Sequence, residues 1–182
     1  DLSLVIDRME TVVPIIRTSC ITMEGIELLD KLFMLLHPRA RDLDKPFLMY
    51  IDKVYSVKGV GTVVSGTILQ GVLEAGEELL LGPFSNGDFK KVKAMSIQTH
   101  YHPLKKVKAG FVVGIAIRGV KHEEVERGMV LCSPDVKPRA YRSFEAEIMV
   151  LNHPTCIRNG YEPVVHIHTI AESVKLRCLD KP

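Results

Sequence analysis

Closely spaced cysteines are missing from this sequence. Its four cysteines, Cys20, Cys132, Cys156 and Cys178, stand at least 22 residues apart, so no Cys-x-x-Cys motif is available for a zinc ribbon or a thioredoxin-type redox pair. Scattered thiols that act as small hydrophobic groups are typical of a reducing compartment. We therefore expect a cytoplasmic protein.

Long hydrophobic runs are missing as well. The longest apolar stretches, residues 32–36 and the glycine-interrupted residues 111–117, are far shorter than the ~20 residues that span a bilayer. Charged side chains near the start exclude a signal peptide: Asp1, Asp7, Arg8 and Glu10. The sequence does not begin with methionine, and we expect it to be a fragment of a longer protein.

A strong charge of one sign is also absent. The net charge is +2 over 182 residues, so a contact with nucleic acid has to come from a local patch. The hydrophobic share of 46% and the charged share of 25% are those of an ordinary globular chain and exclude wholesale disorder. A chain of this length can bury a core without disulfides or a structural metal.

The first 40 residues differ in pattern from the rest. Residues 11–17 predict a short strand. Over residues 24–37 apolar side chains recur at steps of three and four, which predicts an amphipathic helix. We expect Thr22 to cap the helix and Pro38 to end it, because proline has no N–H for the helical ladder. Residues 37–45 are charged and non-periodic, which indicates a linker.

Short β-rich runs follow, separated by glycine turns. They cover residues 47–57, 61–69, 77–81, 89–98, 111–118 and 129–132, a spacing that predicts a sandwich or a small closed barrel. Alternation predicts a core of Val54, Val63, Ile68, Leu79, Leu81, Ile115, Ile117 and Val130. After a second linker, residues 144–151, 161–170 and 173–179 read as three further strands, too few for an independent β domain.

Two glycines and two pairs of histidines are candidate ligand-binding motifs. Gly59 and Gly61 precede a strand rather than a helix, so we interpret them as a hairpin turn and not as a nucleotide loop. The pairs His100/His102 and His166/His168 have the period of one strand face, but no third ligand accompanies them. Solvated or hydrogen-bonded histidines are the favoured interpretation, and no metal site is predicted.

A run of lysines without acids leaves two interpretations open. If its two strands pair, the run forms a basic stripe that neutralises RNA phosphates. The alternative is a solvated lysine edge that discourages aggregation. The stripe consists of Lys90, Lys91, Lys93, Lys105, Lys106 and Lys108.

The order and spacing of motifs over about 85 residues resemble the second domain of elongation-factor-Tu-type translational GTPases. They include residues 47–67, FLMYIDKVYSVKGVGTVVSGT, and residues 118–131, RGVKHEEVERGMVL. Residues 12–37 resemble the end of a GTPase domain. Residues 141–179 resemble the start of the third domain, and residues 144–157, FEAEIMVLNHPTCI, are most similar to the branch of GTP-binding proteins one and two.

This resemblance implies a mainly β fold with three parts. They are the C-terminal end of a GTPase domain (1–40), a domain-two β-barrel (46–134) and the start of a second barrel (140–182). The resemblance also implies GTP and magnesium in the parent protein. Because the phosphate loop and switch regions have no counterpart here, we expect no cofactor and no GTP hydrolysis in this chain alone.

The resemblance further implies the residues of two sites. Ser19, Cys20 and Ile21 match the loop that meets the guanine base. Asp52, Lys53, Tyr55 and Val112 match a pocket for the aminoacylated end of tRNA, and Arg127 matches an arginine near the tRNA's 5′ end. Lys53 replaces an acid and Val112 an asparagine, which predicts weak discrimination of aminoacyl-tRNA. We expect tRNA or ribosome as the partner, and neither membrane nor DNA. The alternative is a barrel that docks a protein.

Overall fold

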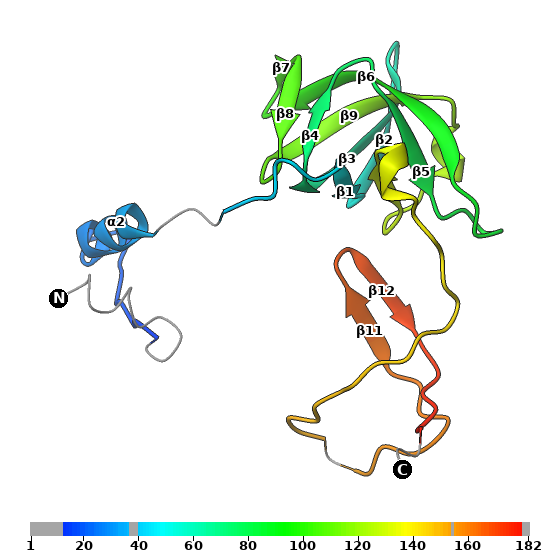
Figure 1. The fold of residues 1–182 in the computed structure, drawn as a ribbon. Helices are drawn as coiled ribbons and strands as arrows, with labels where there is room; N and C mark the ends of the chain where they lie inside the picture. Colours follow the sequence, from blue (N-terminus) through cyan, green and yellow to red (C-terminus); the bar gives the residue numbers. More distant parts are fainter. Residues whose placement is uncertain (1–12, 37–39, 154, 180–182) are drawn as a thin grey trace. The chain divides into compact units, whose positions relative to one another are not determined.

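The computed structural model of the protein describes residues 13–36, 40–153 and 155–179. The chain divides into two units, Asp1–Ala40 and Arg41–Pro182. Figure 1 shows the helix of the first unit in blue and the strands of the second in colours from cyan to red. Within the described residues, neither unit has a helix long and apolar enough to cross a membrane.

The first unit contains the helix α2 (Ile26–Leu35), within the predicted range. Thr22 does not cap it: the N-cap is Gly25, at φ 73°, while the Thr22 N–H donates to Ser19 Oγ at 3.2 Å. A Cβ on Gly25 would lie 2.0 Å from the Arg17 carbonyl oxygen, so the close approach requires glycine. The strand predicted at 11–17 is wrong over residues 13–17, which have no regular structure, and Pro38 lies outside the described residues.

The second unit contains a closed six-stranded antiparallel barrel (Figure 1). Its hydrogen-bonded order is β1 (Leu48–Tyr50), β10 (Val130–Cys132), β5 (Glu78–Gly82), β6 (Lys90–Thr99), β9 (Val112–Arg118) and β3 (Gly61–Gln70). β1 also pairs with β3, which closes the ring. The mainly β prediction with a domain-two barrel is therefore confirmed.

Shorter elements extend this barrel. β2 (Lys53–Val57) pairs with β3, and β7 (His102–Leu104) pairs with β6. β4 (Val72–Glu74) and β8 (Lys106–Lys108) form a separate two-stranded ribbon. Two short 3₁₀ helices, η1 (His122–Glu124) and η2 (Pro134–Val136), flank β10.

The barrel interior holds the hydrophobic core. Five of the eight predicted core residues are buried: Ile68, Leu79, Leu81, Ile115 and Ile117. Val54 is partly buried against the core. The prediction that Val63 and Val130 belong to the core is wrong, because their neighbours Val64 and Leu131 point inward instead, each with 0% of its surface exposed. Both faces of these strands carry apolar residues, so alternation alone does not fix which face is internal.

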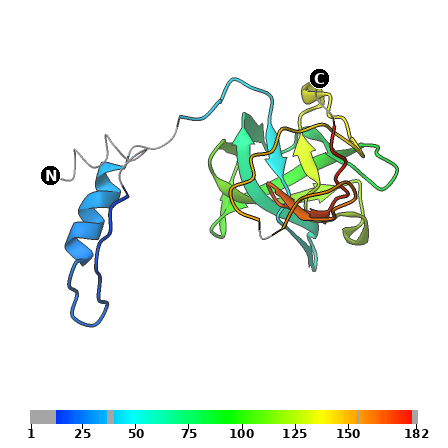
Figure 2. The same ribbon diagram turned by 90° about the horizontal axis from the view of Figure 1, so that it is seen from below.

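The C-terminal part of the second unit contains one hairpin, β11 (Val164–Ile167) and β12 (Ile170–Ser173). The strand predicted at 144–151 is wrong: these residues are exposed and no described segment pairs with them. The predicted strand 161–170 contains β11 but also runs through the turn at 168–169 into β12, and the predicted strand 173–179 overlaps β12 only at Ser173, so the position of the turn is wrong. Backbone bonds such as Leu176 N–H to the Tyr161 carbonyl continue the pairing irregularly beyond the hairpin. Figure 1 shows the hairpin tip turned toward the barrel at β1, and in Figure 2 the hairpin, in orange and red, overlies the barrel.

Contacts at the hairpin tip join it to the barrel. The rings of Tyr50 and His168 stack with centroids 4.1 Å apart. A Cβ on Gly128 would lie 2.7 Å from Ile170 Cγ1, so Gly128 leaves the room that Ile170 fills. The hairpin is therefore packed on the barrel at both β1 and the turn before β10.

Candidate nucleic-acid interface

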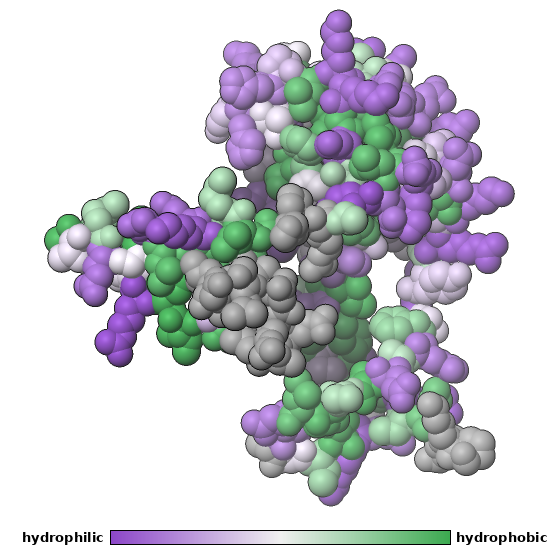
Figure 3. All heavy atoms as spheres, turned by 60° about the vertical axis from the view of Figure 1, so that its left-hand side comes forward, coloured by the Kyte–Doolittle hydropathy of each residue, from purple (hydrophilic) through white to green (hydrophobic). Residues whose placement is uncertain are grey.

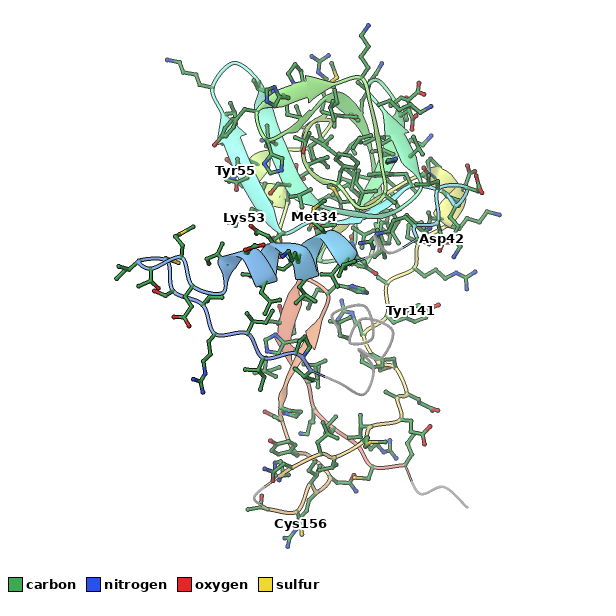
Figure 4. All side chains as sticks on the ribbon, turned by 90° about the vertical axis from the view of Figure 1, so that its left-hand side faces the viewer. Met34, Asp42, Lys53, Tyr55, Tyr141 and Cys156 are labelled. Atoms are coloured by element: carbon green, nitrogen blue, oxygen red, sulfur yellow. The ribbon has the colours of Figure 1, made fainter. Side chains whose placement is uncertain are left out.

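Neighbouring strands place three of the expected RNA-contacting residues on the outside of the barrel. β2 pairs with β3, which pairs in turn with β9. Because side chains alternate between the two faces of a strand, Lys53 and Tyr55 point outward while Val54 packs against the core. Tyr55 is 46% exposed and Val112 on β9 is 58% exposed. Figure 4 labels Lys53 and Tyr55 on β2.

The structure also brings Asp52 and Arg127 together. The Ile51 N–H donates to the Met129 carbonyl at 2.8 Å, and the Gly128 N–H donates to the Ile51 carbonyl at 2.9 Å. These two backbone bonds fasten the turn before β10 to the start of β2. Arg127 Nη2 consequently lies 3.3 Å from Asp52 Oδ1, in an exposed ion pair.

A shallow depression of about 280 Å³ adjoins this face, and sequence reasoning missed it. Small side chains line part of it, including Ser96 on β6 and Ala116 on β9, and Val60 and Arg118 line it as well. Tyr55 faces Val63 across β2 and β3, and Val63 faces Ala116 across β3 and β9. The depression therefore lies on the same outer surface as Tyr55, a proximity that only the strand register reveals.

The predicted lysine stripe is not continuous. Polar and charged side chains cover much of the barrel surface seen in Figure 3. However, β6 pairs with β5, β7 and β9, while β8 pairs with β4. The two strands that carry the lysines therefore do not pair with each other, and the pairing that the basic stripe requires is absent among the described strands. Three of the lysines lie on β6: Lys90, Lys91 and Lys93. The other three lie on β8 or directly before it: Lys105, Lys106 and Lys108.

Two of these lysines are paired with carboxylates. Lys90 Nζ forms an ion pair with Glu124 Oε1 and lies 4.4 Å from the centre of the Phe84 ring. The hydrogen bond from Lys90 lowers the pKa of Glu124. Lys106 Nζ lies 2.7 Å from Glu74 Oε1, and this hydrogen bond raises the pKa of Lys106. These two ammonium groups are already partly neutralised within the protein.

The histidine pairs do not share a strand face. His100 and Tyr101 have φ 46° and 67° and form the two-residue turn between β6 and β7. His166 lies on β11, whereas His168 is in the hairpin turn with φ 52°. Among the described residues, no cluster of three or more His, Cys, Asp or Glu side chains could hold a metal ion. The expectation that each histidine pair shares one strand face is therefore wrong, because His100 and His168 lie in turns.

The expected guanine loop is a short turn in the first unit. Cys20 and Ile21 are exposed, with Ile21 95% accessible. The Ser19 N–H donates to the Glu24 carbonyl at 3.1 Å, and the Ser19 hydroxyl accepts from Thr22. The polar groups of Ser19 thus close their own turn.

Comparison with known protein families matches both halves of the second unit. Residues 61–132 match the family described as elongation factor Tu domain 2. Residues 137–182 match the elongation factor Tu C-terminal domain. The chain belongs to the elongation-factor-Tu-like family of translational GTPases.

Curated relatives agree with this assignment. GTP-binding protein 1 of Xenopus laevis is 38% identical over 173 residues, 94% of this chain and 26% of that protein. Elongation factor 1-alpha of Archaeoglobus fulgidus is 40% identical over 138 residues, 75% of this chain and 31% of that protein. The elongation-factor-Tu-like chain thus spans about a quarter to a third of the length of these relatives.

Solved structures of translation elongation factor SelB from Methanococcus maripaludis are also similar. The apo form has a TM-score of 0.58 at 34% identity, over 65% of this chain and 26% of that one. The complex with the GTP analogue GPPNHP has a TM-score of 0.62 at 34% identity, over 68% of this chain and 27% of that one. The barrel fold and the family assignment are therefore consistent.

Proposed function

We propose that this chain is the part of a translation factor that contacts tRNA, through the outer face of its barrel. The observation that carries the proposal is the exposure of Tyr55 on β2 and of Arg127, which is ion-paired with Asp52 just before β2. An aromatic face can stack on a base, and a guanidinium can bind a phosphate in a fork. This face therefore supplies the two kinds of contact that hold RNA regardless of sequence.

Two further side chains define what the face does not recognise. Lys53 places an ammonium beside Tyr55, and Val112 presents an apolar side chain. An aminoacyl ester has an ammonium and a carbonyl, which an acid and an amide would bind. Lys53 and Val112 offer neither partner, so we infer that tRNA is bound with the same affinity whether or not it carries an amino acid.

GTP and magnesium belong to the proposed whole protein rather than to this site. The described residues do not fit the phosphates or the metal, since Ser19 is engaged within its own turn and no carboxylate cluster is present among them. GTP hydrolysis would need phosphate and magnesium ligands from elsewhere in the protein. We place the proposed factor in the cytoplasm, with tRNA or the ribosome as its partner.

Binding of fluorescein-labelled tRNA to the chain tests this proposal. We expect Tyr55→Ala to weaken binding by about 1–3 kcal/mol, the loss measured for a base–aromatic stack. Arg127→Ala should weaken binding and reduce the salt slope by about one phosphate contact.

Tyr141→Ala is the matched control, because Tyr141 is 72% exposed and lies in the segment after η2 (Figure 4). Equal losses in the Tyr55 and Tyr141 variants would contradict the proposal. Absence of tRNA binding at low salt would favour the alternative, a barrel that docks a protein partner.

A further inference from the structure

We propose that Lys93 and Arg118 form a second phosphate-binding site, which holds the RNA strand beyond the depression next to Tyr55. This inference rests on the proposed function and extends it to residues outside the expected site. The occupant is a single-stranded segment of the same RNA.

The strand register places the two cations next to each other. Lys93 on β6 is the direct antiparallel partner of Arg118 on β9, and both side chains are exposed on the outer face. Like charges directly opposite each other repel, so the pair favours an anion between them. Lys91 lies two residues before Lys93 and therefore on the same face.

Neither Lys93 nor Arg118 takes part in an ion pair within the part of the chain that the structure describes. Glu78 on β5 faces Lys93 from the other side, but no ion pair joins their side chains. Arg118 is likewise outside every ion pair of the described residues, in contrast to Arg127, which Asp52 holds. A phosphate at Lys93 and Arg118 would not have to displace a carboxylate.

The depression beside Arg118 suits a nucleotide better than a peptide carboxylate alone. Two exposed apolar side chains, Val60 at 56% and Met95 at 40%, line it together with Arg118. A base and ribose can lie against these apolar side chains while the phosphate meets the cation. At about 280 Å³ the depression is just below the ≈ 300–1,000 Å³ of small-molecule pockets, which fits one unit of a polymer.

The site is continuous with the face that carries Tyr55. Tyr55, Val63, Ala116 and Ser96 follow one another across β2, β3, β9 and β6, and Arg118 lies two residues along β9 from Ala116. With strands ~4.8 Å apart and a rise of ~3.4 Å per residue, Tyr55 and Arg118 are on the order of 12 Å apart. A few nucleotides of single strand span that distance.

The test is a salt series of tRNA binding with the whole chain, using fluorescein-labelled tRNA without an amino acid. We expect the double variant Lys93→Gln/Arg118→Gln to bind more weakly and to lose about 0.7 of salt slope per contact, the value for single strands. The conservative variant Lys93→Arg should keep the wild-type slope, because it keeps the charge.

The matched control is Lys137→Gln/Arg139→Gln, which removes the same charge from two exposed residues at and after the end of η2. Circular dichroism and thermal melting of each variant ensure that the comparison is between folded proteins. Equal losses in the test and control variants would overturn the site, since only net charge would then matter.

The outcomes separate this inference from the proposed function. If Arg127→Ala weakens binding but Lys93→Gln/Arg118→Gln leaves affinity and slope unchanged, the second site is wrong and the proposed function stands. If the wild-type chain does not bind tRNA at any salt concentration, both are wrong.

Discussion

Arg127 and Asp52 form an exposed ion pair, with Arg127 Nη2 3.3 Å from Asp52 Oδ1. Both residues belong to the expected RNA-contacting set, and the backbone bonds between Ile51 and residues 128–129 bring them together. The carboxylate orients the guanidinium but also competes with a phosphate for it. Asp52 is therefore inferred to weaken the RNA contact that Arg127 makes.

Asp52→Asn should strengthen tRNA binding. Exposed ion pairs are worth about 0.2–1 kcal/mol, so releasing Arg127 should increase affinity by up to about fivefold. The change should disappear when Arg127→Ala is already present. Asp42→Asn is the control, since Asp42 also forms an exposed ion pair, with Lys45 at 2.7 Å (Figure 4). Weaker binding of the Asp52 variant, measured by fluorescence anisotropy, would contradict this role.

Ile115→Ala should destabilise the barrel. Ile115 is 0% exposed and lies on β9 at the centre of the core, so truncation leaves a cavity that costs about 2–5 kcal/mol of unfolding free energy. Val112→Ala on the same strand should change the unfolding free energy by less than about 0.5 kcal/mol, because its side chain is on the surface. Urea unfolding followed by circular dichroism measures both. Similar values for the two variants would contradict the assignment of the inner face.

The buried thiol of Cys132 should make the free energy of unfolding fall as the pH rises above 9. Burial raises the pKa of the Cys132 thiol from 9.0 to about 11. Above pH 9 the unfolded chain loses this proton while the folded chain keeps it, so the unfolding free energy falls as pH rises toward 11, by at most about 1.4 kcal/mol per pH unit. Below pH 9 both states hold the proton and the contribution is constant.

Replacement of Cys132 measures this contribution. Cys132→Ala should flatten the pH dependence of the unfolding free energy between pH 9 and pH 11, in addition to any cavity cost. An identical slope in wild type and Cys132→Ala would show that the thiol does not contribute.

Guanine nucleotide should not bind tightly to this chain. The turn at Ser19 offers at most contacts to a base, and in phosphoryl-transfer sites the phosphate and magnesium contacts dominate. Isothermal titration with GTP and magnesium should give no measurable heat of binding at micromolar protein, and phosphate-release assays should give no turnover. Micromolar affinity would mean that the nucleotide site has been misplaced.

Local pattern predicted much of the fold. Alternation and glycine turns placed the main barrel strands, and Ile115 and Ile117 were correctly assigned to the core. Where apolar residues follow one another along a strand, as at residues 63–64, alternation could not show which face points into the core. In the structure Thr62 and Val64 are buried, while Val63 is only half-buried. Residues 144–151 alternate as well, but a strand also needs a partner for its backbone, which alternation does not reveal.

The site was less predictable, because its geometry is made by distant segments. The resemblance identified Asp52 and Arg127 separately, but their ion pair depends on pairing between residues 51 and 128–129. The depression lined by Ser96, Ala116 and Arg118 depends on the register of β6 on β9. The prediction that His100 and His102 share a strand face is wrong, because a turn with positive φ at His100 and Tyr101 interrupts the strand. Spacing along the sequence does not show such a turn.

Equilibrium binding of tRNA with and without its amino acid tests the central proposal most directly. Filter binding across a salt series of about 50–200 mM should give affinities that fall steeply with salt, as expected for phosphate contacts. Both forms of tRNA should bind with the same affinity, since Lys53 and Val112 provide no partner for the aminoacyl group. A strong preference for aminoacylated tRNA, or no binding of either form at the lowest salt, would contradict the account.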